Sequence, residues 1–153
     1  MKIRISGIII VMLLALIFPS CTTNMSDGTV TVVLTGAETI DTEFLYAYVY
    51  QEGETDLNNP AKVLACGSAD ISASGLASMV LKVADVAGEP TGDDWVGSGG
   101  VYDIYIYTDD AGNVPEEATS KMTDPMPMDI TIDGNITVNI LFGDMVPYKL
   151  SGS

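Results

Sequence analysis

The sequence predicts an all-β protein, built as an antiparallel two-sheet β-sandwich of about seven strands with Greek-key connections. Three observations predict this fold. From Gly28 onward, apolar and polar residues alternate with a period of two, as in half-buried strands. No window of this body carries an apolar stripe at helical spacing. Turn residues recur at intervals of about 8 to 15 residues, which suits short strands in one domain.

The first two strands have the clearest alternation. Residues 29–35 alternate aliphatic side chains with threonines and end at Gly36. Residues 44–50 place aliphatic side chains on one face and aromatic ones on the other, and a polar loop over residues 52–60 follows. Both patterns predict strands with one face toward the core.

The middle of the chain predicts shorter elements. Residues 62–66 and 69–72 are expected to form short strands, and residues 76–83 form a longer one with apolar residues at alternate positions. A connection rich in Gly and Asp over residues 88–95 then leads to a strand over residues 101–108.

The last two predicted strands, residues 128–132 and 135–142, are separated by Asp133 and Gly134. An Asp-Gly pair between alternating segments is typical of a two-residue type I′ hairpin, because both turn positions need a positive φ. The sequence therefore predicts that these two strands pair with each other.

In outline the body resembles the transthyretin-like and carboxypeptidase-regulatory-like sandwiches of envelope proteins. The resemblance rests on the opening strand, which ends in Thr35-Gly36, and on the run over residues 99–107. The Cys-Trp-Cys pattern of immunoglobulin domains is absent, so an immunoglobulin-like arrangement is expected in architecture only. Such a likeness implies a fold and transfers no functional residues.

The first 20 residues read as a signal peptide. Lys2 and Arg4 precede an apolar run of 11 residues over 8–18, and a membrane-spanning helix would need about 20. The run closes at Pro19-Ser20-Cys21 and is followed by small polar residues.

This layout resembles the precursors of bacterial lipoproteins, in which a lipobox directs diacylglyceryl transfer to a cysteine and cleavage before it. Ser20 and Cys21 match the lipobox, whereas Phe18 and Pro19 depart from it. The resemblance implies a lipid on Cys21, a membrane as a partner, and a bacterial envelope location, at the outer membrane facing periplasm or surface. The alternative is an ordinary secretory leader, although Phe18 fits the A-x-A pattern poorly.

These readings divide the precursor into four parts. Residues 1–20 are the signal peptide, residues 21–28 the lipidated cysteine and a flexible tether, residues 29–148 the sandwich, and residues 149–153 a C-terminal tail. The tether is expected to be disordered because its residues are small and polar.

The charge of the chain excludes one class of partner. The precursor carries −15, and loss of the leader leaves four lysines against 21 acidic residues, a net charge of −17. Such a domain repels phosphate backbones and anionic lipids, so no nucleic acid is expected to bind. A solvated surface that keeps the domain soluble accounts for most of the acids.

The residue inventory predicts no enzyme and no cofactor. The chain contains no histidine, so the commonest general base and metal ligand is missing. Lipidation of Cys21 would leave Cys66 without a disulfide partner, and its apolar neighbours predict a buried, unreactive thiol.

One loop gathers oxygen ligands that Ca²⁺ could use, namely those of Asp109, Asp110, Asn113 and Glu116. The EF-hand spacing is absent, and the same residues are typical of an exposed hairpin tip. No metal site is therefore predicted, and the four residues remain weak calcium candidates.

Five tyrosines alternate with the aliphatic residues of two strands: Tyr46, Tyr48, Tyr50, Tyr105 and Tyr107. If the aliphatic face is the core, the rings point outward and could stack sugar rings or receive a partner protein. Alternatively they are cross-strand pairs under a loop, or the two faces are reversed and they form the core.

Two functions remain open. The first is a lipid-anchored envelope protein of structural, adhesive or protein-binding type, and the second is a glycan-binding module that uses an exposed tyrosine face. Exposure of the rings distinguishes them, because coplanar exposed tyrosines favour glycan binding and a mostly buried set favours the first function.

Overall fold

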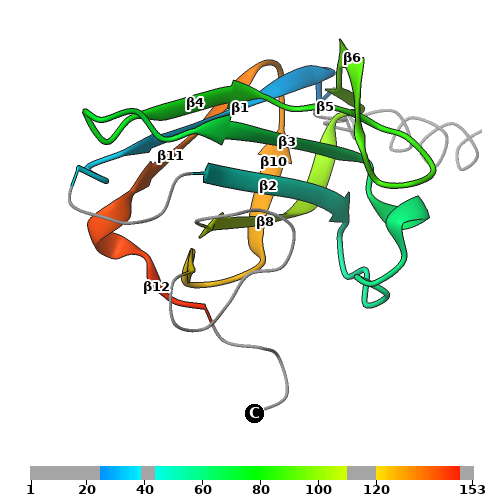
Figure 1. Ribbon diagram of the computed structural model, residues 1–153. Coiled ribbons are helices and arrows are strands. Elements are labelled where there is room, and N and C mark those ends of the chain that lie inside the picture. The colour runs from blue at the N-terminus through cyan, green and yellow to red at the C-terminus, as the bar shows by residue number, and fades with distance from the viewer. Residues whose placement is uncertain (1–24, 39–43, 110–119, 149–153) are drawn as a thin grey trace, which may run out of the picture.

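The computed structural model describes residues 25–38, 44–109 and 120–148, and it is an all-β open sandwich of two facing sheets (Figure 1). The two regular helical segments of the described residues are single 3₁₀ turns, η1 (Pro60–Lys62) and η2 (Phe142–Asp144). No helix in the described ranges has the length and apolar character needed to span a membrane.

The first sheet is centred on β1 (Gly28–Thr35). It pairs with β11 (Ile136–Leu141) on one side and β4 (Ala77–Val80) on the other, and the short β7 (Val96–Gly97) pairs with its first residues. β1 and β11 run parallel, whereas the other pairs among the described strands are antiparallel. The described sheets are thus mainly antiparallel, as predicted, with the pair of β1 and β11 as the exception.

The second sheet has the order β12-β9-β8-β2-β3-β5-β6, and β10 also pairs with β8. Its central strands are β2 (Phe44–Gln51) and β8 (Gly100–Asp109). The others are β3 (Ala65–Asp70), β5 (Lys82–Ala84), β6 (Pro90–Asp94), β9 (Lys121–Met122), β10 (Met128–Ile132) and β12 (Val146–Pro147). Several short strands at the margins of this sheet were not predicted, because segments of two or three residues carry no periodic signal.

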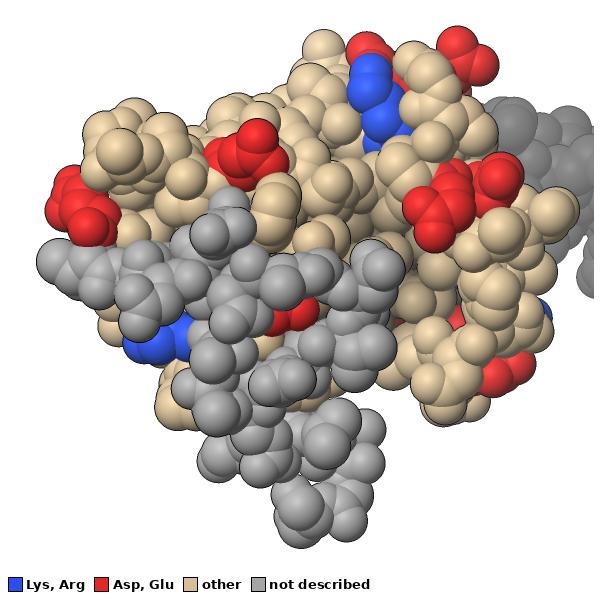
Figure 2. Space-filling view, in the orientation of Figure 1, with Lys and Arg blue, Asp and Glu red and all other residues tan. Residues whose placement is uncertain are grey.

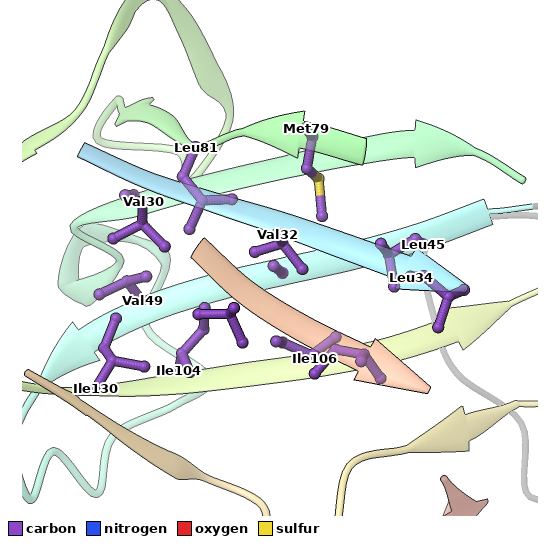
Figure 3. Close-up of a cluster of buried hydrophobic side chains, with 14 of the residues drawn as sticks. Val30, Val32, Leu34, Leu45, Val49, Met79, Leu81, Ile104, Ile106 and Ile130 are labelled. Atoms are coloured by element: carbon purple, nitrogen blue, oxygen red, sulfur yellow. The ribbon is translucent and has the colours of Figure 1, made fainter. Parts of the chain in front are cut away.

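The core lies between the two sheets and follows the predicted alternation (Figure 3). Its central side chains are fully buried, and they come from β1, β2 and β8: Val30, Val32, Leu34, Leu45, Ala47, Val49, Ile104 and Ile106. The aliphatic face of residues 44–50 is therefore the core face, which decides between the two orientations that the sequence left open. The tyrosines of β2 consequently lie on the opposite face of the second sheet.

The predicted Asp133-Gly134 hairpin is wrong. β10 pairs with β8 in the second sheet, and β11 pairs with β1 in the first, so the chain crosses between sheets at this point. Gly134 has a φ of 82°, but no non-glycine residue of the described chain has a positive φ, so a type I′ turn is absent. Pairing β11 with β1 aligns Val138 and Ile140 with the buried positions of β1, and this long-range burial outweighs the local turn preference.

Other boundaries also differ from the prediction. The expected strand over residues 76–83 is split into β4 and β5, which lie in different sheets, and the buried Leu81 between them marks the crossing. One strand, β3, takes the place of the two strands expected over residues 62–66 and 69–72. The start of the first expected strand belongs to the 3₁₀ turn η1, which the Asn59 side chain caps. The connection over residues 88–95 contains β6.

The fold begins earlier than residue 29. β1 starts at Gly28, and the amide and hydroxyl of Ser26 both donate to Asp133 Oδ1, at 3.1 and 3.0 Å. The Gly134 amide donates to the Ser26 carbonyl at 3.1 Å, and the Gly99 amide donates to Asp27 Oδ1 at 3.2 Å. The prediction of a free tether up to residue 28 is therefore corrected for these residues, and residues 21–24 lie outside the described part.

Candidate binding groove

The paired central strands of the second sheet bring the tyrosines together. In the antiparallel register of β2 and β8, Tyr46 lies opposite Tyr107 and Tyr48 opposite Tyr105, while Tyr50 lies opposite Asp103. Opposite and diagonal positions on one face are within reach of aromatic side chains. The register, which the sequence does not specify, thus converts two separate stripes into one cluster.

The rings pack largely on one another, and only Tyr46, Tyr48 and Tyr105 keep part of their surface accessible. Tyr107 stacks with Tyr46 and Tyr48, with ring centroids 5.2 and 6.1 Å apart, and Tyr50 meets Tyr105 edge to face at 5.4 Å. Tyr50 is 6% and Tyr107 9% exposed, and the other three are half-buried. The five tyrosines are thus cross-strand pairs on the outer face, and they form no flat exposed platform.

Four of these tyrosines line an open groove of about 560 Å³. Its floor is formed by Tyr48, Tyr50, Tyr105 and Tyr107. One wall is the loop between β2 and β3, and the turn between β5 and β6 adds a second; together they contribute Thr55, Leu57, Asn58, Pro60, Val63, Ala87, Gly88 and Glu89. Met126 and Tyr148 lie along the remaining side.

Hydrogen bonds hold the β2–β3 loop in place. The Tyr50 hydroxyl donates to the Leu57 carbonyl at 3.4 Å, and the Gly53 amide donates to Asp103 Oδ2 at 2.9 Å. Lys62 forms an ion pair with Glu54 at 3.5 Å across the same loop. A half-buried polar network of this kind positions the wall before any ligand binds.

The second wall is a tight turn braced by Asp85 and Cys66. Asp85 Oδ1 accepts from the amides of Ala87 and Glu89, at 2.8 and 3.0 Å. The Cys66 thiol donates to the Gly88 carbonyl at 3.3 Å. Burial, with the charges of Glu89 and Asp85 acting in the same direction, raises the pKa of this thiol to about 11. The prediction of a buried Cys66 is confirmed, and its thiol supports the groove from behind.

The tyrosine hydroxyls of the floor remain protonated at ordinary pH. Burial raises the pKa of Tyr50 to about 12 and also raises the pKa values of Tyr48, Tyr105 and Tyr107. The neighbouring Tyr48 also contributes to the raised pKa of Tyr107. The groove can therefore donate hydrogen bonds and stack against a ligand, but its phenols are not poised as bases.

The calcium candidates do not assemble into a described site. Asp109 ends β8, is 3% exposed and accepts a hydrogen bond from the Ser120 hydroxyl at 3.3 Å. It is therefore no exposed hairpin tip. Asp110, Asn113 and Glu116 lie outside the described residues, as does the proposed lipid attachment site Cys21. Within the described ranges, no three acidic or cysteine residues group closely enough to hold a metal ion.

Sequence reasoning missed the walls of the groove. Leu57 is 37% exposed within an otherwise polar loop, and this isolated apolar residue is a weak signal that could have been noticed. Met126 and Tyr148 are far from β2 in the chain and carried no signal. Acidic side chains are spread over the visible face of the molecule (Figure 2).

Comparison of the chain with protein-family models, with curated proteins and with solved structures found no match.

Proposed function

We propose that this protein is a lipid-anchored, non-enzymatic protein of the bacterial cell envelope that binds a protein partner in the tyrosine-lined groove. The observation that carries the binding role is the groove itself, which gathers four tyrosines with Leu57, Pro60 and Met126. Aromatic residues and methionine are enriched in protein interfaces, and tyrosine is a frequent energetic anchor.

The anchoring role rests on the leader. The charged start, the 11-residue apolar run and Cys21 at its end support export followed by lipidation of the thiol. Cys21→Ser should move the protein from the detergent-extracted membrane fraction to the soluble fraction. If the variant stays in the membrane fraction, the anchor is not on this cysteine.

Packing of the tyrosines supports protein binding over sugar binding. A sugar-binding platform presents flat ring faces, whereas here Tyr107 is stacked between Tyr46 and Tyr48, and Tyr50 is covered by its own loop. Glycan binding remains the second candidate, favoured by the tyrosine hydroxyls and the polar wall residues Thr55 and Asn58. Binding of a panel of oligosaccharides to the purified protein tests this second function directly.

Site-specific photo-cross-linking tests the groove in intact cells. A benzophenone amino acid at Leu57, on the groove wall, should give discrete protein adducts. The same probe at Val96, which is 55% exposed on β7 of the other sheet, is the matched control. Adducts at Leu57 that disappear with Tyr105→Leu support the proposal. Equal adducts at both positions, or none at Leu57, contradict it.

A further inference from the structure

The described residues that line the groove carry a negative charge. Glu89 is exposed and lines the groove, and no lysine or arginine lines it among the described residues. The chain without its leader carries −17, so the surroundings of the groove reinforce this sign. An anionic ligand would therefore meet repulsion without a compensating partner.

The negative charge acts on the tyrosine floor itself. Burial is the main cause of the raised pKa of Tyr48 and of Tyr105. The charge of Asp103 adds to the shift at Tyr105, and the charge of Glu89 makes a smaller contribution in the same direction at Tyr48. A negative potential that disfavours a phenolate at these rings favours a cation at the same place. The ring faces add their own attraction for a cation.

Lysines in the described part of the chain are already engaged elsewhere. Lys62 pairs with Glu54, Lys82 pairs with Asp94, and Lys121 lies 4.6 Å from the centre of the Phe142 ring. None of these cations contributes to the groove. Among the described residues, none supplies a cation to the groove, so a cation there can come from a ligand.

We propose that the groove recognises a lysine or arginine side chain of an extended basic segment on the partner protein, held over Tyr48 and Tyr105 and facing Glu89. This inference rests on the proposed function, because it names the chemistry of the partner for the same groove. The volume of about 560 Å³ lies within the usual range of ligand sites. The combination of aromatic rings with a carboxylate suits a cation, which is attracted by both the ring faces and the negative charge.

The test uses the full chain, purified in non-ionic detergent, and short peptides with blocked termini. The peptides differ only in the side-chain group of their two basic residues. The peptide Gly-Lys-Gly-Lys-Gly and its arginine counterpart should bind, and the version with Nε-acetylated lysines should bind at least about tenfold more weakly. Affinity should fall as salt is raised from about 20 to about 500 mM, because the interaction is screened. Isothermal calorimetry measures each affinity.

Variants separate a specific site from general acidity. Glu89→Gln and Tyr105→Leu should each weaken binding by about two- to fivefold, the range for one partly exposed charge or cation–π contact. Tyr105→Phe should retain binding, because it keeps the ring and loses only the hydroxyl. Asp93→Asn removes an exposed acid of β6 that does not line the groove, and it should change the affinity little. Unchanged melting curves verify that each variant folds.

Three outcomes would overturn the cation proposal. The first is that the acetylated peptide binds as well as the charged one. The second is that Asp93→Asn weakens binding as much as Glu89→Gln, and the third is that none of the basic peptides binds. A neutral peptide or oligosaccharide whose binding depends on Tyr105 would leave the groove as a binding site and reject only the cation. Absence of adducts at Leu57 in cells would reject the groove itself.

Discussion

Gly28→Ala tests the placement of β1 against the crossing between the two sheets. A Cβ atom at Gly28 would overlap the carbonyl of Gly134 and stand 2.8 Å from the Asn135 amide nitrogen. These are backbone atoms, so no change of side-chain rotamer relieves the clash. Either β1 or the crossing segment must move, and the hydrogen bonds that join them at Ser26 and Thr29 are weakened.

The cost can be estimated from these contacts. Overpacking a tight site costs about 1–3 kcal/mol, and a backbone clash belongs at the upper end of that range. Weakening one or two hydrogen bonds adds about 1 kcal/mol. We expect the free energy of unfolding to fall by about 3–4 kcal/mol out of a typical total of about 5–15 kcal/mol. For a domain of this size the melting temperature should drop by about 10–15 °C.

Thermal and urea unfolding can be followed by the fluorescence of Trp95, the single tryptophan, which is buried in the core against Tyr102. Gly143→Ala is the matched control, since a Cβ there meets no atom within 4 Å. It should change the stability by less than about 0.5 kcal/mol. If both variants melted within about 2 °C of each other, β1 would not pass against residues 134 and 135, and the hairpin predicted from the sequence would regain support.

Three further predictions concern the core, the groove and metal ions. Ile106 is fully buried in the core, so Ile106→Ala should lower the free energy of unfolding by about 3–4 kcal/mol and Ile106→Val by about 1 kcal/mol. Urea denaturation measures both losses, and equal, small losses would contradict the core assignment. Folding raises the pKa of Cys66 from 9.0 to about 11 and that of Tyr50 from 10.0 to about 12. Because both groups are protonated more readily in the folded state, the stability that they contribute is present below about pH 9. It is lost as the pH rises through 11 and 12. The melting temperature should therefore decline above pH 9, and less steeply in Cys66→Ala; an unaltered slope would refute the role of the thiol. EDTA should leave the melting temperature unchanged, because Asp109 bonds to Ser120 within the fold; a large fall restored by calcium would implicate residues 110–116 as ligands.

The groove illustrates how far prediction from sequence could go. Alternation identified the tyrosine stripes of residues 46–50 and 105–107, but it left open which face of these strands is buried, and the packed core shows that it is the aliphatic one. It could not show that β2 and β8 are neighbours, nor that the loop carrying Leu57 folds back over Tyr50. Both depend on contacts between segments far apart in the chain, which leave no local pattern.

The sequence by itself determined the all-β class and the principal strands, because a period of two is a local property that survives in any sheet. Which face of the tyrosine strands is buried was decided by the packing of the two sheets. The sequence also predicts an export leader and shows the excess of acidic residues. The tertiary structure alone decided which strands pair. β10 and β11 joined different sheets although Asp133-Gly134 favours a hairpin between them. Burial of Val138 and Ile140 beside β1 is a gain that only the assembled core can supply, and it exceeds the conformational preference of a two-residue turn.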